Sequence, residues 1–247
     1  MEHFVDIHCH ILPRVDDGAK DEQETLDMLR TAWDDGTRLM VATPHWNRER
    51  GYTKSRREIA VAYKKAQRLA QSIHPKFRIY SGQEVAYDSS VPEAAARGEF
   101  LFLGNSRYLL VEFSPVDGFS RIENGLTQLR MQGIKPVLAH IERYDCFRKE
   151  PELAERIASL GVPIQINAAS LSGEHGKDYG SCSKAVLLSG CASLVGSDAH
   201  DLKNRAPLMR DCAVHIANRY SESAAELLFR NNALRILKNL PVEPVSV

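Results

Sequence analysis

The sequence alternates short apolar runs with longer segments whose apolar residues recur at helical spacing, and this alternation most constrains the fold. Each short run is almost wholly apolar, which is typical of strands buried on both faces of a parallel sheet. Strands that alternate with helices in this way indicate parallel βαβ units. Seven runs predict strands, at residues 4–8, 38–43, 78–84, 108–113, 136–140, 163–167 and 193–197.

The segments between these runs predict helices with recognisable ends. Gly36, Gly133 and Gly161 stand where three helical patterns stop, as expected for C-terminal caps. Ser223 and Glu226 form the Ser-x-x-Glu pattern of a capping box, which starts the last predicted helix. The helices are predicted at residues 21–35, 55–73, 122–132, 151–160, 179–188, 204–220 and 223–239.

The chain of 247 residues contains no linker, internal repeat or low-complexity stretch. Seven strand–helix units in this length predict a single α/β domain over residues 1–247, folded as a distorted (β/α)7 TIM-like barrel. Periodicity does not distinguish a closed barrel from an open sheet. A doubly wound open sheet therefore stands as the alternative.

The composition restricts the class of protein. Lys plus Arg and Asp plus Glu each number 32, so the basic excess typical of a nucleic-acid-binding domain is missing. No apolar run approaches the roughly 18–20 residues of a membrane span, so we expect no membrane insertion. The five cysteines are scattered without a Cys-x-x-Cys pair. That pattern suits reduced thiols and predicts a cytoplasmic protein.

Side chains of the kind that bind metals gather at the ends of the predicted strands. Six of the seven strands end in a histidine or an acidic residue, and a further aspartate follows the first strand in a loop. The C-terminal ends of barrel strands meet at one rim, where active sites lie. We therefore expect nine side chains to converge there as metal ligands: His8, His10, Asp17, His45, Glu84, Glu112, His140, Asp198 and His200.

The residue types at this rim indicate a transition-metal site. Imidazoles mixed with carboxylates suit Zn, Mn or Fe better than Ca or Mg alone. His8 and His10 lie two residues apart on a strand, so both point to the same side. A lone histidine is more often structural, so the prediction depends on the whole set. Cations would also relieve the repulsion among four converging carboxylates, and such a site suits phosphate-ester hydrolysis.

Two neighbouring features allow more than one interpretation. Asp16 precedes Asp17 and Gly18, and a turn-forming role would explain it without catalysis. The basic segment 48–57 follows His45 directly and could be a mobile lid that meets an acidic phosphopeptide; a solvated loop and helix start explains it equally well. The other histidines are expected to be structural or solvated: His3, His74, His175 and His215.

The strand-end motifs resemble those of the polymerase-and-histidinol-phosphatase (PHP) superfamily. The shared motifs are His-Cys-His at 8–10, Thr-Pro-His at 43–45, Gly-Gln-Glu at 82–84, Ala-His-Ile-Glu-Arg at 139–143 and Ser-Asp-Ala-His at 197–200. Within it the chain is most similar to the bacterial manganese-dependent protein-tyrosine phosphatases of capsule and exopolysaccharide operons. That similarity rests on residues 6–30, 42–46, 109–113, 136–144, 165–173 and 196–209.

The resemblance implies three divalent ions, Mn²⁺ first, with Fe or Zn as alternatives. The first ion would take His8, His10, Glu84 and Asp198. The second would share Glu84 and add Glu112 and His140, and the third would take Asp17, His45 and His200. Arg143 and Arg205 fall where the family binds the substrate phosphate. A surface or capping salt bridge is the alternative role for these arginines.

The resemblance also implies the reaction and its partner. A metal-bridged hydroxide would hydrolyse phosphotyrosine on a bacterial tyrosine autokinase that regulates polysaccharide synthesis. A cysteine mechanism is unsupported, because no arginine stands six residues after any cysteine. Two other functions stay open: a PHP-type phosphoesterase for a small monoester such as histidinol phosphate, and a non-catalytic metal-binding regulator of a kinase.

Overall fold

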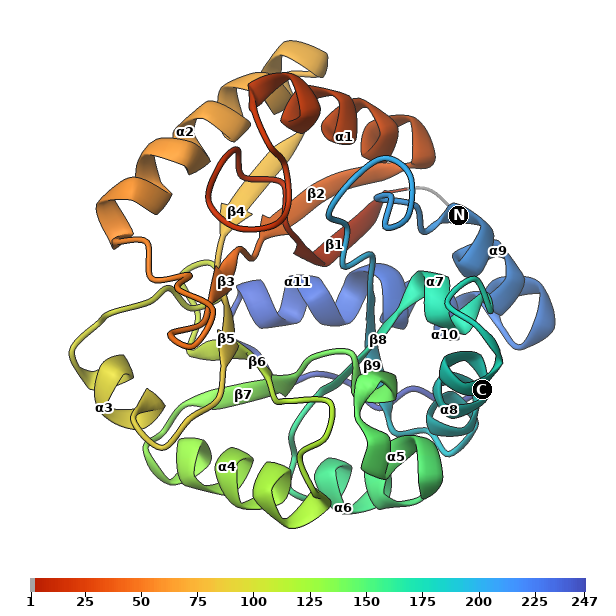
Figure 1. The fold of residues 1–247 in the computed structure, drawn as a ribbon. Helices are drawn as coiled ribbons and strands as arrows, with labels where there is room; N and C mark the ends of the chain where they lie inside the picture. The colour runs from red at the N-terminus through yellow and green to blue at the C-terminus, as the bar shows by residue number, and fades with distance from the viewer. Residues whose placement is uncertain (1–2) are drawn as a thin grey trace.

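The computed structural model describes residues 3–247, and its strands lie at the centre with helices around them (Figure 1). All strand pairs are parallel, as predicted from the apolar runs. The first sheet has the order β1-β2-β4 and the second the order β3-β5-β6-β7-β8-β9. The strands are β1 (Phe4–Cys9), β2 (Thr37–Ala42), β3 (His45–Trp46), β4 (Arg78–Ser81), β5 (Glu84–Ala86), β6 (Tyr108–Glu112), β7 (Lys135–Leu138), β8 (Ile164–Asn167) and β9 (Ala192–Gly196).

The strand predicted at 78–84 is split into two short ones, and a further short strand, β3, follows the strand predicted at 38–43. Pro44, which has no backbone N–H to donate, separates β2 from β3. Gly82 and Gln83 separate β4 from β5. Hydrogen bonds still join the split regions, because Gly82 N donates to Ala42 O at 2.9 Å and Glu84 N to Pro44 O at 3.2 Å. The predicted strand regions are thus all present.

The two sheets do not form one continuous closed ladder, so the predicted barrel closure is not established. β1 nevertheless contacts β9 at the carboxyl ends of the two strands. Asp198 N donates to His8 O, and His10 N donates to Ala199 O, both at 2.8 Å. The buried Asp6 side chain strengthens this junction by accepting hydrogen bonds from Ser197 N at 3.0 Å and Ser197 Oγ at 2.6 Å. These contacts bring the first and last strand ends together.

The helices surround the strands, and their ends follow the expected chemistry in the first half of the chain. Asp21 caps α1 by accepting from Glu24 N, and Gly36 ends it with φ 108°. Ser55 and Glu58 form a capping box at the start of α2. The longer helices are α1 (Glu22–Asp35), α2 (Arg56–Ile73), α4 (Phe119–Met131), α8 (Lys177–Leu188) and α9 (Arg210–Arg219).

The remaining helices are short. The sequence patterns missed α3 (Val91–Ala96), the 3-10 helix η1 (Ile141–Arg143), α5 (Asp145–Lys149) and α7 (Ala168–Leu171), which each contain six residues or fewer. The predicted helix 151–160 is present as α6 (Leu153–Ser159). The last predicted helix consists of α10 (Glu222–Glu226), the π-helical η2 (Leu227–Asn231) and α11 (Asn232–Leu237). Its cap is Ser221, which accepts from Ala224 N, so the capping box predicted at Ser223 was wrong.

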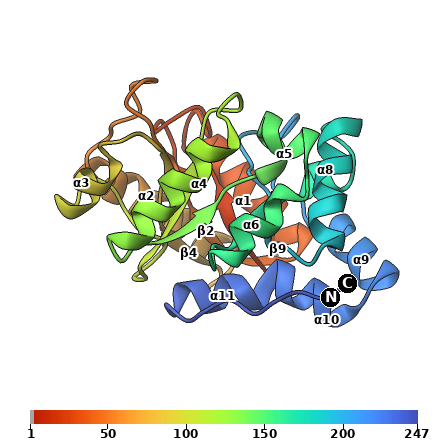
Figure 2. The same ribbon diagram turned by 90° about the horizontal axis from the view of Figure 1, so that it is seen from below.

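Helix α11 covers the end of the strands opposite the long loops (Figure 2). Ala233 and Ile236 of α11 belong to the innermost apolar cluster together with strand residues such as Ile7 and Leu110. The larger apolar cluster packs the outer faces of β5 to β9 against helices such as α4, α6 and α8. The centre of the molecule is therefore sealed at one end. The loops that follow the strands lie at the other end.

No helix among the described residues is both long and apolar enough to cross a membrane.

Candidate metal centre

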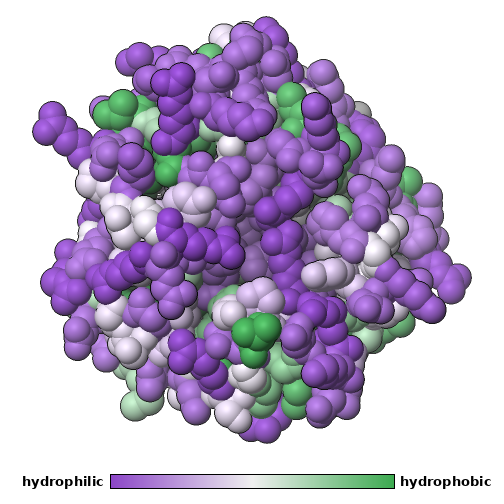
Figure 3. Space-filling view, in the orientation of Figure 1, coloured by the Kyte–Doolittle hydropathy of each residue, from purple (hydrophilic) through white to green (hydrophobic). Residues whose placement is uncertain are grey.

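The structure brings all nine predicted ligand side chains together at the carboxyl ends of the strands. In space-filling view this face is hollowed at its centre and lined with hydrophilic residues (Figure 3). The nine predicted ligand residues form four overlapping groups. Within each group the candidate metal-binding atoms lie within 4.8 Å of one another. The groups are His10–Asp17–His45–His200, His8–His10–Asp198, His8–Glu84–His140 and His45–Glu84–Glu112.

Glu84 lies at the centre of this cluster. Its Oε2 is 3.3 Å from Nε2 of both His8 and His10 and 3.1 Å from His45 Nδ1. Its Oε1 is 2.7 Å from His140 Nε2. One fully buried carboxylate thus contacts four imidazoles.

The grouping differs from the predicted ligand sets at His8, His10 and His45. His8 is grouped with Glu84 and His140 as well as with His10 and Asp198. His10 belongs to the Asp17 group as well as to the group of His8 and Asp198. His45 reaches Asp17 Oδ1 with Nε2 at 3.5 Å and Glu112 Oε1 with Nδ1 at 3.2 Å, so its ring lies between two of the predicted sites. The nine residues therefore form one continuous cluster of overlapping groups.

Two of the converging residues carry unusual backbone conformations. His140 has φ 30° and Asp198 has φ 54°, in the left-handed region that residues other than glycine seldom adopt. Both follow the end of a strand, β7 and β9, where the chain turns sharply. Such strain persists only where the surroundings enforce it, and it is common at functional sites.

Burial and charge compete strongly at the cluster. Burial alone would lower the pKa of His8, but the Glu84 and Asp198 carboxylates outweigh burial and raise that pKa to about 9. For His45 the same competition, with Glu84 and Glu112 as the anions, raises the pKa to about 12. His200 differs: burial and the nearby His10 lower its pKa to about 4. In the metal-free protein, therefore, protonated imidazoles compensate the carboxylates.

The residues fit a group of divalent cations. Buried polar atoms usually have hydrogen-bond partners. Several ligand-type atoms here make no hydrogen bond within the described chain: His45 Nδ1, Glu84 Oε2, Glu112 Oε1, His140 Nδ1, Asp198 Oδ1 and His200 Nε2. A mixed imidazole and carboxylate donor set suits Mn, Fe or Zn. A bound cation would satisfy metal-binding atoms that converge in this way.

A layer of buried polar side chains orients these residues. Asp16 Oδ2 lies 2.6 Å from His10 Nδ1. Gln165 Oε1 lies 3.1 Å from His8 Nδ1, and Asn167 Nδ2 donates to Asp198 Oδ2 at 2.8 Å. Partners of this kind fix the ring tautomer and leave the other nitrogen free for a metal. Gln165 and Asn167 were missed in the sequence, and Asp16 was left ambiguous.

Arg143 and Arg205 both reach the cluster. Arg143 Nη2 lies 2.9 Å from Asp198 Oδ2, and Arg205 Nη2 lies 2.5 Å from Asp198 Oδ1. The two side chains are only about a quarter exposed, at 27% and 25%. Both also line a cavity of about 390 Å³ next to the predicted ligands. Neither arginine therefore belongs to an ion pair on the protein surface.

The segment after His45 is ordered. Residues 47 and 52 pair as an antiparallel bridge, with Asn47 N donating to Tyr52 O at 2.9 Å and Tyr52 N to Asn47 O at 2.8 Å. Tyr52 stacks on the His45 ring with centroids 5.6 Å apart. Arg48 forms an ion pair with Glu99 at 2.7 Å. These contacts form a hairpin at the rim, directly after His45.

The fold and the site together define an α/β protein with a His/Asp/Glu cluster that could hold metal ions and two arginines beside it. Residues 4–238 match the model of the family described as capsular polysaccharide synthesis, CpsB/CapC. The chain is 32% identical to the tyrosine-protein phosphatase CpsB of Streptococcus pneumoniae, covering 95% of this chain and 98% of that one. It is 33% identical to the tyrosine-protein phosphatase YwqE of Bacillus subtilis, covering 98% and 97% of the two chains.

A solved structure agrees with these sequence similarities. It comes from work on YwqE and CpsB, described as unique metal-dependent tyrosine phosphatases, and superposes with a TM-score of 0.88 at 29% identity, covering 98% of this chain and 99% of that one. The chain belongs to the CpsB/CapC family.

Proposed function

We propose that this protein is a metal-dependent protein-tyrosine phosphatase. The observation that carries the proposal is the single cluster of nine His, Asp and Glu side chains with Arg143 and Arg205 at its edge, in a chain similar over nearly its whole length to CpsB and YwqE. The nine residues would hold three divalent ions, with Mn²⁺ as the first candidate and Fe or Zn as alternatives. When bound, the ions would supply Lewis acidity, activate water and neutralise phosphate charge.

The arginines would bind the phosphate. A guanidinium presents parallel N–H donors that match two phosphate oxygens, and both side chains face the cavity. Burial and the surrounding carboxylates compete at Arg143, and the Asp198 and Glu142 charges raise its pKa, so it stays cationic. The leaving group would be a tyrosine phenolate, whose conjugate acid has a pKa near ~10, so the need for a strong general acid is small.

A cysteine nucleophile does not fit this site. No cysteine lines the cavity among the described residues. Cys9 is the nearest in sequence to the predicted ligands, but it is fully buried, and burial raises the pKa of its thiol well above the usual value. A buried thiol of this kind is a poor nucleophile. The phosphate would therefore transfer to water without a covalent phosphoenzyme.

The substrate and the setting belong to the same proposal. The natural substrate would be a tyrosine-phosphorylated protein, namely a bacterial tyrosine autokinase that regulates capsule or exopolysaccharide synthesis. All five cysteines carry free thiols, which suits the reducing cytoplasm. The fold would be a single domain over residues 1–247, a distorted barrel in which the hydrogen bonds between the ends of β1 and β9 support closure.

The test is hydrolysis of a phosphotyrosine peptide by the purified protein with Mn²⁺, compared with histidinol phosphate. We expect release of phosphate from the peptide and little from histidinol phosphate. His140→Ala should abolish turnover, whereas His215→Ala, a substitution of an exposed histidine on α9, should not. A protein that binds Mn²⁺ but hydrolyses no aryl phosphate would refute the proposal and favour a non-catalytic regulator. Preference for histidinol phosphate would favour the small-molecule phosphoesterase.

A further inference from the structure

The cavity beside the metal centre extends well beyond the predicted ligands. Its additional lining comes from residues 47–50, 86–88 and 113–115 and from Asp117, Arg121 and Tyr144. Most of these side chains are polar, and several are already engaged, such as Arg121 with Asp117 at 3.1 Å. The lining includes Tyr87, Phe113 and Pro115, next to the ends of β5 and β6.

Tyr87 and Phe113 form an aromatic pair at these strand ends. The parallel register of β5 and β6 continues one step past the strands, because Tyr87 N donates to Glu112 O at 2.8 Å. The two ring centroids are 5.0 Å apart, with an angle of 33° between the ring planes. Phe113 is only 4% exposed, whereas Tyr87 is partly exposed. Phe113 therefore supports Tyr87 from behind, and Tyr87 presents its ring to the cavity.

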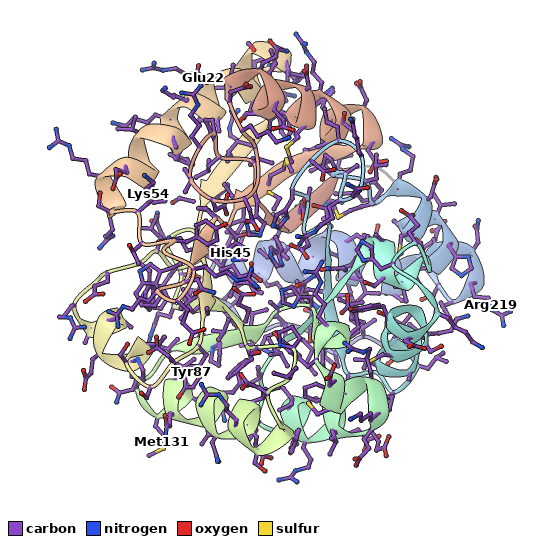
Figure 4. The ribbon with its side chains drawn as sticks, viewed as in Figure 1. Glu22, His45, Lys54, Tyr87, Met131 and Arg219 are labelled. Atoms are coloured by element: carbon purple, nitrogen blue, oxygen red, sulfur yellow. The ribbon has the colours of Figure 1, made fainter. Side chains whose placement is uncertain are left out.

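Helix α4 fixes this pair in position. Tyr87 Oη donates a hydrogen bond to Gln128 Oε1 at 2.6 Å. Gly125 makes room for both rings, since a Cβ atom there would lie 2.7 Å from Tyr87 Cε1 and 2.9 Å from Phe113 Cε1. Figure 4 shows Tyr87 between His45, near the centre of the face, and helix α4. Holding the metal ligands does not require this arrangement, because neither ring contacts a predicted ligand's imidazole.

We propose that Tyr87, supported by Phe113, forms an aryl subsite that packs against the phenyl ring of the substrate. The inference rests on the proposed phosphatase function and adds a determinant of specificity to it. With the phosphate at Arg143 and Arg205, the remainder of an aryl ester would lie in the same cavity, whose lining includes Tyr87 and Pro115. Offset aromatic contacts favour a phenyl ester over an alkyl ester. Gln128 and Gly125 act as positioning residues for the Tyr87 ring.

The experiment compares two inhibitors that share a phosphonate group and differ in the ring. Inhibition constants of phenylphosphonate and methylphosphonate are measured for the Mn²⁺-loaded protein and for Tyr87→Ala. We expect the variant to bind phenylphosphonate about tenfold more weakly and methylphosphonate within about twofold of the unmodified protein. KM for a phosphotyrosine peptide should rise while kcat stays nearly constant. Tyr80→Ala is the matched control, because Tyr80 is 39% exposed and does not line the cavity.

A second variant tests the same site without removing the ring. Gln128→Leu keeps the Tyr87 side chain but removes the acceptor of its hydroxyl, so it should weaken phenylphosphonate selectively by about two- to threefold. Equal weakening of both phosphonates, or no weakening of either, would overturn the subsite. Failure of the unmodified protein to hydrolyse phosphotyrosine would instead refute the proposed function itself, and the two failures are therefore distinguishable.

Discussion

Asp16 Oδ2 lies 2.6 Å from His10 Nδ1 and also accepts a hydrogen bond from His45 N at 2.8 Å, so one carboxylate orients two of the predicted metal ligands. Its Oδ1 accepts from Gly18 N at 3.1 Å. The Asp16 side chain is fully buried, whereas that of its neighbour Asp17 is 42% exposed. The two adjacent aspartates thus have separate positions: Asp17 faces the cavity, and Asp16 lies behind the imidazoles.

Asp16→Asn should weaken metal binding without removing a ligand. The amide has one oxygen where the carboxylate has two, so it cannot replace both the contact with His10 Nδ1 and the hydrogen bond from Gly18 N. It also lacks the negative charge, and the His10 ring therefore loses its fixed orientation. Loss of such a partner typically lowers metal affinity by about 10–100-fold. Mn²⁺ titration followed by calorimetry would measure the change. Asp27→Asn on α1 is the control, and equal Mn²⁺ affinity in both variants would show that Asp16 acts only in the turn.

Arg143→Lys and Arg205→Lys should weaken phosphate binding by about tenfold or more, because an ammonium cannot provide the bidentate geometry of a guanidinium. The measurement is the inhibition constant of inorganic phosphate, with metal content determined on the same samples. Arg156→Lys, in an exposed pair with Glu123, is the control. Both arginines contact Asp198, so loss of metal with unchanged phosphate affinity would instead mean that they serve to hold this carboxylate.

The metal-free protein should be most stable near pH 6.5. The pKa of His8 is raised to about 9 in the folded protein, from about 6.5 in the unfolded chain. Its charged form therefore stabilises the fold fully below about pH 6.5, and this stabilisation is lost as the pH rises toward 9. The pKa of His200 is lowered to about 4, so stability falls as pH drops from 6.5 toward 4. Asp17 adds a further loss only below about pH 4, because the His200 hydrogen bond holds its pKa below the usual range.

Urea midpoints of chelator-treated protein between pH 4 and 9 would test this profile. His8→Asn should flatten the alkaline side of the curve, whereas His215→Asn should leave its shape unchanged. A midpoint that rises steadily from pH 6.5 to 9 would contradict the assigned direction of the His8 shift.

The convergence of the predicted metal ligands could be predicted from the sequence, because most of them lie at the carboxyl ends of strands. Each of six apolar runs ends in an imidazole or carboxylate, and parallel strands place their carboxyl ends together. The orienting layer was harder to see. Gln165 and Asn167 lie two residues apart on β8, the one predicted strand without a ligand, and so point to the same side. Two buried amides at that spacing were the available signal.

The start of α9 was predicted less accurately, because its cap comes from a distant residue. The pattern at 204–220 predicts a helix that begins six residues before the observed start of α9 at Arg210. That start is set by Asp35 of α1, whose Oδ2 accepts from Met209 N at 2.7 Å and Arg210 N at 2.9 Å. Asp201 Oδ1 also accepts from the backbone N of Lys203 at 2.6 Å and of Asn204 at 2.7 Å, which holds the preceding residues in a loop. The sequence around α9 cannot indicate that its start is capped by Asp35, which lies 174 residues before Met209.

Gly18→Ala should destabilise the loop that carries Asp16 and Asp17. A Cβ atom on Gly18 would lie 2.0 Å from His10 O and 2.6 Å from His10 Cβ, so the backbone under the metal centre would have to move. Crowding of this kind costs about 1–3 kcal/mol of unfolding free energy, and it should also weaken Mn²⁺ binding because His10 shifts.

Gly118→Ala provides the matched control, since a Cβ there meets nothing within 4 Å and its φ of −71° suits any residue. Urea denaturation should place the control within about 0.5 kcal/mol of the unmodified protein. If both alanine variants were equally stable and bound Mn²⁺ equally well, the loop would have room to adjust. The close approach of Gly18 to His10 would then have no part in holding the metal ligands.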